Sequence, residues 1–211
     1  MIRAAISTVA ATMMWLIGSV AVAIEEPAFR AIEQDGAFEL REYAPYLLAE
    51  TSVDADFMEA GNVAFGRLFR YISGANVSQR KLAMTAPVTQ SAGEKISMTA
   101  PVRQIADGRQ FRVGFIVPSQ YTLATVPQPS DPRVKIRRVE GGLVAVWRYS
   151  GRWTEANFRE HEQLLNQEIV RRGLLATGAA SIARYNSPFA LPMFRRNEVQ
   201  VTVSRAAPAP R

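Results

Sequence analysis

The sequence predicts an α+β protein built from two similar halves that share one mixed or antiparallel sheet system. The elements follow the order strands, helix, strands twice, around residues 29–117 and 134–203, and this order is typical of α+β domains. No segment between the halves has the character of a linker between independent domains. The chain has 211 residues, of which 48% are hydrophobic and 21% are charged, so it can bury a substantial core.

Three strands are predicted at the start of the first half. Residues 29–33 and 37–43 flank Asp35-Gly36, a dipeptide typical of tight hairpin turns. Residues 46–53 are predicted to continue as a third strand.

A helix is predicted after these strands. It begins at a cap formed by Asp54 or Asp56, because a short side-chain oxygen satisfies the first free amides, and it runs through Ser73. Gly74 stands where a left-handed residue commonly ends a helix. The apolar side chains recur at helical spacing, as Met58, Phe65, Leu68, Phe69 and Ile72.

A ten-residue motif is repeated after this helix. Residues 81–90 (KLAMTAPVTQ) recur as residues 95–104 (KISMTAPVRQ), with a short Gly-containing turn at residues 91–94. This arrangement predicts a hairpin, with each proline at an edge or a bulge because proline cannot donate to a ladder. Residues 111–117 predict a further strand, and the proline-containing residues 118–132 predict a loop.

The second half repeats the order with a hairpin, a helix and two late strands. Gly141-Gly142 predicts a turn between strands at residues 134–139 and 143–149. Thr154 predicts the N-cap of a helix that runs to about Arg172. The remaining predictions are a helix end at Gly173, strands at residues 181–185 and 198–203, and a disordered Ala/Pro-rich tail at residues 205–211.

The first 23 residues have the three-part layout of a secretory signal peptide. Arg3 is the only charge before Glu25, an apolar run follows it, and Ala21-Val22-Ala23 is a small-x-small cleavage pattern. We therefore expect a periplasmic or secreted protein whose folded domain covers residues 24–204. The alternative is an uncleaved membrane anchor, since residues 4–23 are uncharged over about the length that spans a bilayer.

Composition and motifs exclude several kinds of site. The chain has no cysteine and one histidine, His161, so disulfides, thiolate metal sites and multi-histidine sites within one chain are impossible. No nucleophile elbow or P-loop is present, and the zinc-protease pattern that begins at His161 has Leu165 where the second histidine is required. We therefore expect a binding protein and not an enzyme.

Charge gives a weaker constraint on partners. The formal charge of +6 favours an anionic partner. Lysine and arginine are scattered along the chain without a clustered stripe, which argues against a nucleic-acid partner. A membrane partner is expected only if the N-terminal segment stays uncleaved.

Five segments together resemble the SOUL haem-binding protein family. They are FELREY (38–43), FGRLFRYISGAN (65–76), the paired MTAPV motifs (84–88 and 98–102), PQPSDPRVKI (127–136) and SPF...RRNEV (187–199). The resemblance implies a distorted, barrel-like antiparallel or mixed sheet with two long helices in two pseudo-symmetric halves. It also implies a shallow apolar cleft beside the first helix, where animal members take haem or other tetrapyrroles. The fold superfamily also includes effector-binding domains of bacterial regulators, so the fold alone does not dictate haem.

The resemblance places Asn62, Phe65, Phe69 and Arg70 along that cleft. A tetrapyrrole needs a flat apolar slot for its faces and cations for its carboxylates, and the two phenylalanines share a helix face because they are four residues apart. Leu191 stands near the late loop that borders the family cleft, where some relatives carry a lysine. The alternative is that Phe65 and Phe69 are simply the buried face of an amphipathic helix and that Arg70 is a solvated residue.

His161 is the candidate metal ligand, since a neutral imidazole can ligate iron. It falls on or near the apolar stripe of the second helix, where a core histidine or a residue without a role is the alternative. Met84 and Met98 begin the two MTAPV copies. A thioether can ligate haem iron, but methionine more commonly fills gaps in a core.

We therefore expect an exported protein that binds haem or a related tetrapyrrole reversibly and non-covalently in an apolar surface cleft. One alternative is a non-haem binding module that takes a lipid or another amphipathic small molecule. The other is a structural envelope protein without a ligand.

Overall fold

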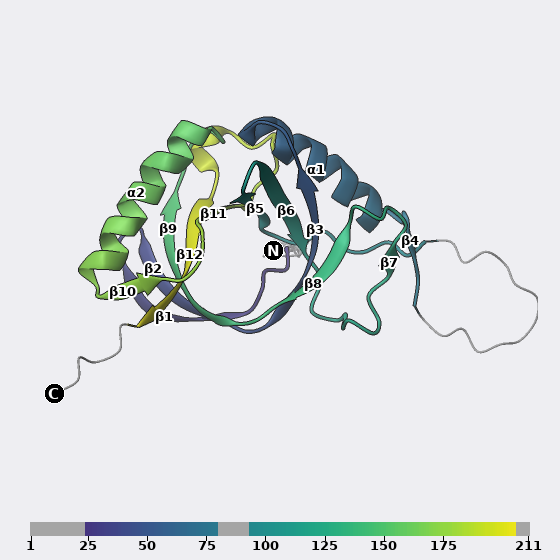
Figure 1. The fold of residues 1–211 in the computed structure, drawn as a ribbon, viewed down its shortest axis with the longest axis horizontal. Coiled ribbons are helices and arrows are strands. Elements are labelled where there is room, and N and C mark those ends of the chain that lie inside the picture. Colours follow the sequence, from purple (N-terminus) through teal and green to yellow (C-terminus); the bar gives the residue numbers. More distant parts are fainter. Residues whose placement is uncertain (1–23, 80–92, 206–211) are drawn as a thin grey trace, which may run out of the picture.

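A computed structural model describes residues 24–79 and 93–205 as an α+β fold of two halves (Figure 1). The predicted signal peptide and the first MTAPV copy lie outside these residues. The first half contains β1 (Phe29–Asp35), β2 (Phe38–Tyr43), β3 (Tyr46–Val53), α1 (Phe57–Ile72), β4 (Asn76–Val77), β5 (Val102–Asp107) and β6 (Gln110–Ile116). The second contains β7 (Gln128–Pro129), β8 (Lys135–Val139), β9 (Gly142–Tyr149), α2 (Glu155–Arg171), β10 (Leu174–Ala176), β11 (Ser181–Arg184), the 3-10 turn η1 (Pro192–Phe194) and β12 (Asn197–Arg205).

One large antiparallel sheet runs through both halves. Its strand order is β1-β2-β9-β12-β11-β5-β6-β3-β8, with β10 added to β12. The sheet curls strongly without closing into a barrel, and both helices lie on its outer side (Figure 1). The predicted α+β class with a distorted antiparallel sheet is therefore confirmed.

The predicted hairpin around Gly141-Gly142 is wrong. β8 pairs with β3, and β9 pairs with β2 and β12. Tyr43 is opposite Gly142 in the β2–β9 pair, and Tyr46 is opposite Val139 in the β3–β8 pair. The β2–β3 segment and the β8–β9 segment therefore keep one pairing register across both ladders. A Cβ on Gly141 would lie 2.2 Å from the Tyr43 carbonyl oxygen. Gly141 therefore permits the close approach of the β8–β9 connection to the β2–β3 connection, and it does not form a tight hairpin turn.

The hairpin predicted from the MTAPV repeat is also wrong for the strand of the second copy. This copy is irregular until Val102, where β5 begins. Both edges of β5 are occupied, by β6 and by β11. The remaining strand differences are small: a short β4-β7 ladder lies partly in the predicted loop at residues 118–132, and β12 extends to Arg205 at the start of the predicted tail.

The helix ends follow the sequence signals in part. The Thr154 hydroxyl accepts a hydrogen bond from the Asn157 amide at 3.2 Å, as an N-cap should. Asp56 occupies the N-cap position of α1, but its side chain makes no capping hydrogen bond. Gly74 and Gly173 follow the two helices with positive φ, as predicted.

Two apolar clusters hold the helices to the sheet. α1 packs on β3 and β6, and α2 packs on β9, β10 and β12. The buried residues of α1 lie on one face and include Ala60, Ala64, Leu68 and Tyr71, each at most 2% exposed. Within residues 24–79 and 93–205, no helix is long and apolar enough to cross a bilayer.

A buried charged network links β2 to β12 across the intervening β9. The Arg41 guanidinium donates to both carboxylate oxygens of Glu198, at 2.8 and 2.9 Å, and Tyr185 and Gln200 each donate to the same carboxylate at 2.8 Å. Burial alone would raise the pKa of the Glu198 carboxyl. The bonds and charge of Arg41, aided by Arg196, outweigh burial and lower that pKa below its usual value.

Candidate functional site

An exposed stripe of four residues runs along α1. Met58, Asn62, Phe65 and Phe69 follow at intervals of four, three and four, so they lie on one face of the helix. Phe65 is 36% exposed and Phe69 is 50% exposed. The alternative that both rings are simply buried is therefore wrong. The face of α1 that packs on the sheet is formed by other residues, such as Ala60, Ala64 and Leu68. We call these four residues the α1 stripe.

The two rings of the α1 stripe stack on each other and form an exposed aromatic pair. Their centroids are 5.9 Å apart and their planes differ by 10°. Phe65 also meets Phe115 of β6 edge-on at 5.2 Å, which fixes one ring against the core while Phe69 stays more open. Parallel exposed rings of this kind can stack on another planar system.

Residues 96–104 pass along α1 next to the stripe. The Ile96 amide donates to the Ile72 carbonyl at the C-terminal end of α1, at 2.8 Å. The Gln104 side chain donates to the Phe57 carbonyl at the N-terminal end, at 2.7 Å. Met98, the start of the second MTAPV copy, lies between these contacts and is exposed. This segment forms a border of the site.

Arg184 is a cation near the stripe that the sequence reading did not single out. A Cβ on Gly61 would lie 2.8 Å from the Arg184 guanidinium, so Arg184 packs directly against this glycine, and Phe65 follows one helical turn later. Arg184 is buried, and burial lowers its pKa to about 10, which leaves it charged at neutral pH. Its Nη2 donates to Gln104, while its Nε has no hydrogen-bond partner. A charged residue within the otherwise small and apolar strand SIAR was the available sequence signal.

Arg70 does not lie on the stripe. It is exposed, and one residue along a helix turns its side chain about 100° away from that of Phe69. Leu191 is exposed in the loop at residues 186–196, which the Gly151 amide anchors by donating to the Pro192 carbonyl at 2.9 Å. Among the described residues, no hydrogen bond joins Leu191 to the α1 stripe.

His161 lies on α2 and not with the stripe. The helices approach each other where Phe57 stacks on Phe158 at 5.7 Å, and they diverge from there (Figure 1). The His161 ring stacks on Tyr149 of β9 at 4.0 Å, and its Nδ1 lies 2.7 Å from the Asn157 carbonyl oxygen. Residues 24–79 and 93–205 hold no group of three or more His, Asp or Glu side chains suited to a metal ion.

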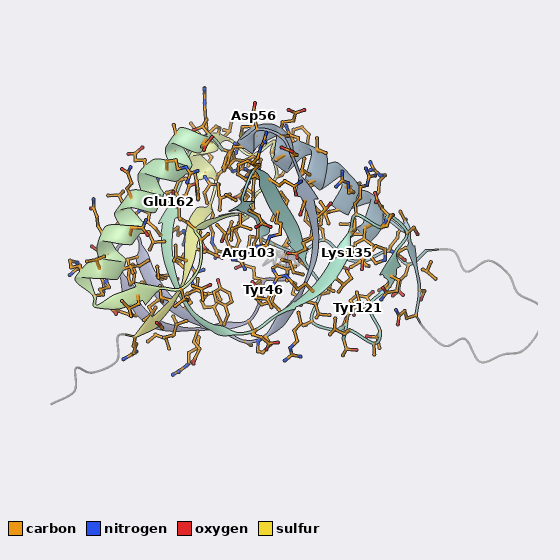
Figure 2. The ribbon with its side chains drawn as sticks, in the orientation of Figure 1. Tyr46, Asp56, Arg103, Tyr121, Lys135 and Glu162 are labelled. Atoms are coloured by element: carbon orange, nitrogen blue, oxygen red, sulfur yellow. The ribbon has the colours of Figure 1, made fainter. Side chains whose placement is uncertain are left out.

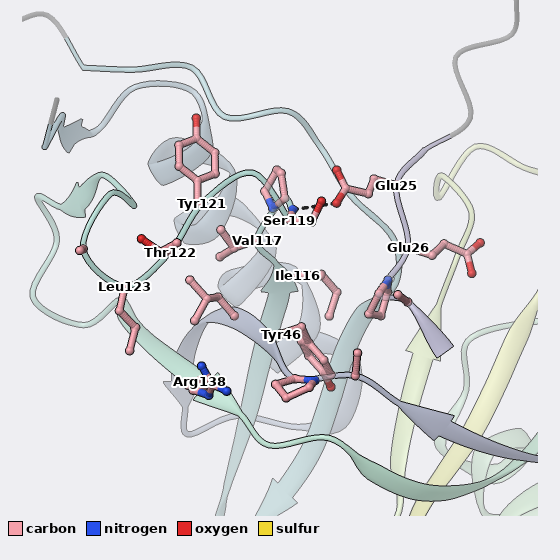
Figure 3. Close-up of a pocket in the computed structure, with 17 residues that line it drawn as sticks. Glu25, Glu26, Tyr46, Ile116, Val117, Ser119, Tyr121, Thr122, Leu123 and Arg138 are labelled. Atoms are coloured by element: carbon pink, nitrogen blue, oxygen red, sulfur yellow. Dashed lines mark hydrogen bonds between the residues drawn. The ribbon is translucent and has the colours of Figure 1, made fainter. Parts of the chain in front are cut away.

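A separate cavity of about 700 Å³ lies at the ends of β3 and β6 (Figure 3). The Glu25 carboxylate accepts a hydrogen bond from the Ser119 amide across its rim at 2.7 Å. The Tyr46 phenol, which also lines it, accepts a hydrogen bond from Arg103 (Figure 2). None of the sequence-predicted site residues lines this cavity. Its walls are mostly apolar and include Pro27, Ala28, Pro45, Leu47, Ile116, Val117, Pro118, Leu123 and Ala124.

The fold and these surfaces define a two-half α+β domain that offers both an aromatic helix face and an apolar cavity to small molecules. The sequence model of the SOUL heme-binding protein family matches residues 24–202, and the chain belongs to this family.

Known proteins with similar sequences carry heme-binding names. Heme-binding protein 2 of Homo sapiens is 30% identical over 186 residues, which cover 85% of this chain and 86% of that protein. Heme-binding protein 1 of Xenopus tropicalis is 30% identical over 169 residues, which cover 79% and 84%. Among solved structures, the EcmrR C-terminal domain matches with a TM-score of 0.58 at 11% identity, over 84% of this chain and 99% of that domain. This last likeness concerns the fold alone.

Proposed function

We propose that this protein binds haem or a related tetrapyrrole, reversibly and non-covalently, on the α1 stripe. The observation that carries the proposal is the pair of parallel, half-exposed rings of Phe65 and Phe69. They lie on a helix of a chain whose relatives are named heme-binding proteins. A planar apolar macrocycle can stack on an exposed aromatic ring, which a flexible lipid chain cannot do.

The chain's own residues suit the parts of such a ligand. The Phe65–Phe69 pair would give the macrocycle aromatic contact on one side, and Met58 and Met98 would add apolar contact or a thioether at the edges. Arg184 at one end of the stripe would attract a carboxylate, with Arg70 as a more distant solvated cation. Burying the macrocycle contributes several kcal/mol at roughly 25 cal/mol per Å², before the costs of association.

The direct test is an absorbance titration of the purified protein with haemin. We expect the Soret band to shift and to saturate at about one haemin per chain, because one stripe offers one face. A linear uptake of several haemins without saturation would contradict the proposal.

A second candidate function is the binding of a non-haem amphipathic molecule in the cavity of about 700 Å³. This volume lies within the range of typical ligand pockets, about 300–1,000 Å³. Native mass spectrometry of protein purified without added haemin separates the two functions. A co-purified lipid-sized mass supports the cavity, and an unliganded mass removes the support for it.

We also propose that the chain is exported, on the strength of the charged start, apolar run and small-x-small pattern in its first 23 residues. N-terminal sequencing of the protein from its host tests this. A start at Ile24 supports export with cleavage, and a start at Met1 or Ile2 contradicts cleavage.

A further inference from the structure

The loop at residues 186–196 exposes an unusual amount of apolar surface. Phe189 is 94% exposed and Phe194 is 75% exposed, and Leu191 and Met193 are also more than half exposed. Four large exposed apolar side chains therefore lie within six residues, and such clustering marks interaction sites more often than scattered exposed residues do. We call this segment the apolar loop.

The apolar loop is held in shape by its own polar contacts. The Arg195 guanidinium donates to the Ala190 carbonyl at 2.9 Å and to the Pro188 carbonyl at 2.7 Å, and it also lies over the Trp153 ring at 4.4 Å. The Arg196 amide donates to the Asn186 side chain at 2.6 Å. The apolar side chains are therefore presented by an already ordered loop, which lowers the entropic cost of docking.

Basic residues lie on this loop and beside it. Residues 184–197 contain three arginines and no acidic residue. In the part of the chain that the structure describes, Arg195 forms no ion pair with a carboxylate, and nearby Arg152, which is exposed, forms none either. Only Arg196 is neutralised, by Glu26 and Glu198. The loop thus combines exposed apolar side chains with guanidinium groups that have no carboxylate partner. This combination is complementary to a partner that has an apolar interior beneath an anionic surface.

We propose that the apolar loop docks on an anionic lipid bilayer. Phe189, Met193 and Phe194 enter the boundary between headgroups and acyl chains, and Arg195 and Arg152 face the lipid phosphates. Apolar groups inserted at this depth act together with the electrostatic attraction of basic residues to an anionic membrane surface. The apolar side chains of the loop are all more than half exposed, so they suit insertion into a bilayer better than the enclosure of a small ligand. This inference is independent of haem binding.

The absence of cysteine makes the test site-specific. In the full chain, Phe189→Cys labelled with the polarity-sensitive dye NBD reports on the loop. The matched control is Val170→Cys with the same dye, because Val170 is an equally apolar, 76% exposed residue on α2. Each labelled protein is mixed with vesicles of phosphatidylcholine and phosphatidylglycerol, and with vesicles of phosphatidylcholine alone.

We expect NBD at position 189 to brighten at least twofold and shift to the blue on the anionic vesicles, and NBD at position 170 to stay unchanged. Raising the salt to about 1 M should weaken the response, because it screens the guanidinium charges. No change at position 189 would overturn the proposal. Equal changes at both positions, or an equal response to uncharged vesicles, would also overturn it. The outcome does not depend on whether haemin binds.

Discussion

Replacing Glu198 with glutamine is expected to lower the free energy of unfolding by about 3–5 kcal/mol. Glu198 and Arg41 are buried to 0% and 1% exposure, and they pair through two hydrogen bonds. Glutamine keeps the shape but removes the charge, so the buried Arg41 guanidinium loses its two-bonded carboxylate partner and keeps only Glu39, at 2.6 Å, as a counter-charge. Breaking one side of such a pair costs about this much.

Urea unfolding followed by circular dichroism measures this loss. The matched control is Glu42→Gln, which breaks the exposed pair with Arg30, at 2.7 Å and mostly in solvent. Exposed pairs contribute about 0–1 kcal/mol, so we expect a small effect there. An equal loss of unfolding free energy in both variants would show that the buried Arg41–Glu198 pair stabilises the fold no more than an exposed pair does.

The same pair predicts how stability depends on pH. Glu198 has a folded-state pKa below its unfolded value, which is about 4.3 for a model glutamate. Its stabilising contribution is therefore complete above that pH and is lost as the pH falls through the folded-state pKa. The difference in stability between the wild type and Glu198→Gln should shrink below about pH 4.

Replacing Phe69 with aspartate is expected to weaken haemin binding about ten- to hundredfold. The change removes an apolar ring that would stack on the macrocycle, and full burial of a phenylalanine is worth roughly 1.5–3 kcal/mol. It also places a negative charge next to a ligand that carries carboxylates. Because Phe69 is 50% exposed, the fold should tolerate the change.

Two variants control for this effect in the same haemin titration. Val170→Asp adds the same charge to an exposed apolar position on α2 and should leave haemin affinity unchanged. His161→Ala should weaken binding less than Phe69→Asp, because the His161 ring packs on Tyr149 of β9. A larger loss from His161→Ala would mean that the imidazole holds the iron and that the α1 stripe is not the main contact.

Local signals in the sequence were sufficient for most elements of the fold. The Asp35-Gly36 turn, the Thr154 cap and the glycines that follow both helices act within a few residues, and the structure has each of them where predicted. The β8–β9 connection shows the limit of such signals. Gly141-Gly142 has the composition of a turn, but its conformation is set by contact with the Tyr43 backbone about a hundred residues away in sequence.

The sequence was sufficient to predict the aromatic residues of the candidate site, but not which other parts of the chain lie next to them. Helical spacing places Phe65 and Phe69 on one face of α1. The apolar residues of this helix cover more of its circumference than the sheet buries, so spacing alone cannot show which rings stay exposed. Arg184 reaches α1 only because β11 pairs with β5. The cavity depends on the N-terminal residues 25–28 folding against the end of β6. Both are long-range features without a local sequence signal.

The most direct test is to map backbone amide NMR shifts during a titration with zinc protoporphyrin, a diamagnetic haem analogue. We expect the shifts to cluster on residues 58–69 and on the adjoining residues 96–98, and to saturate at about one ligand per chain. Shifts centred on residues 25–28 and 116–124 would instead place the ligand in the cavity and contradict the assignment of the α1 stripe as the tetrapyrrole site.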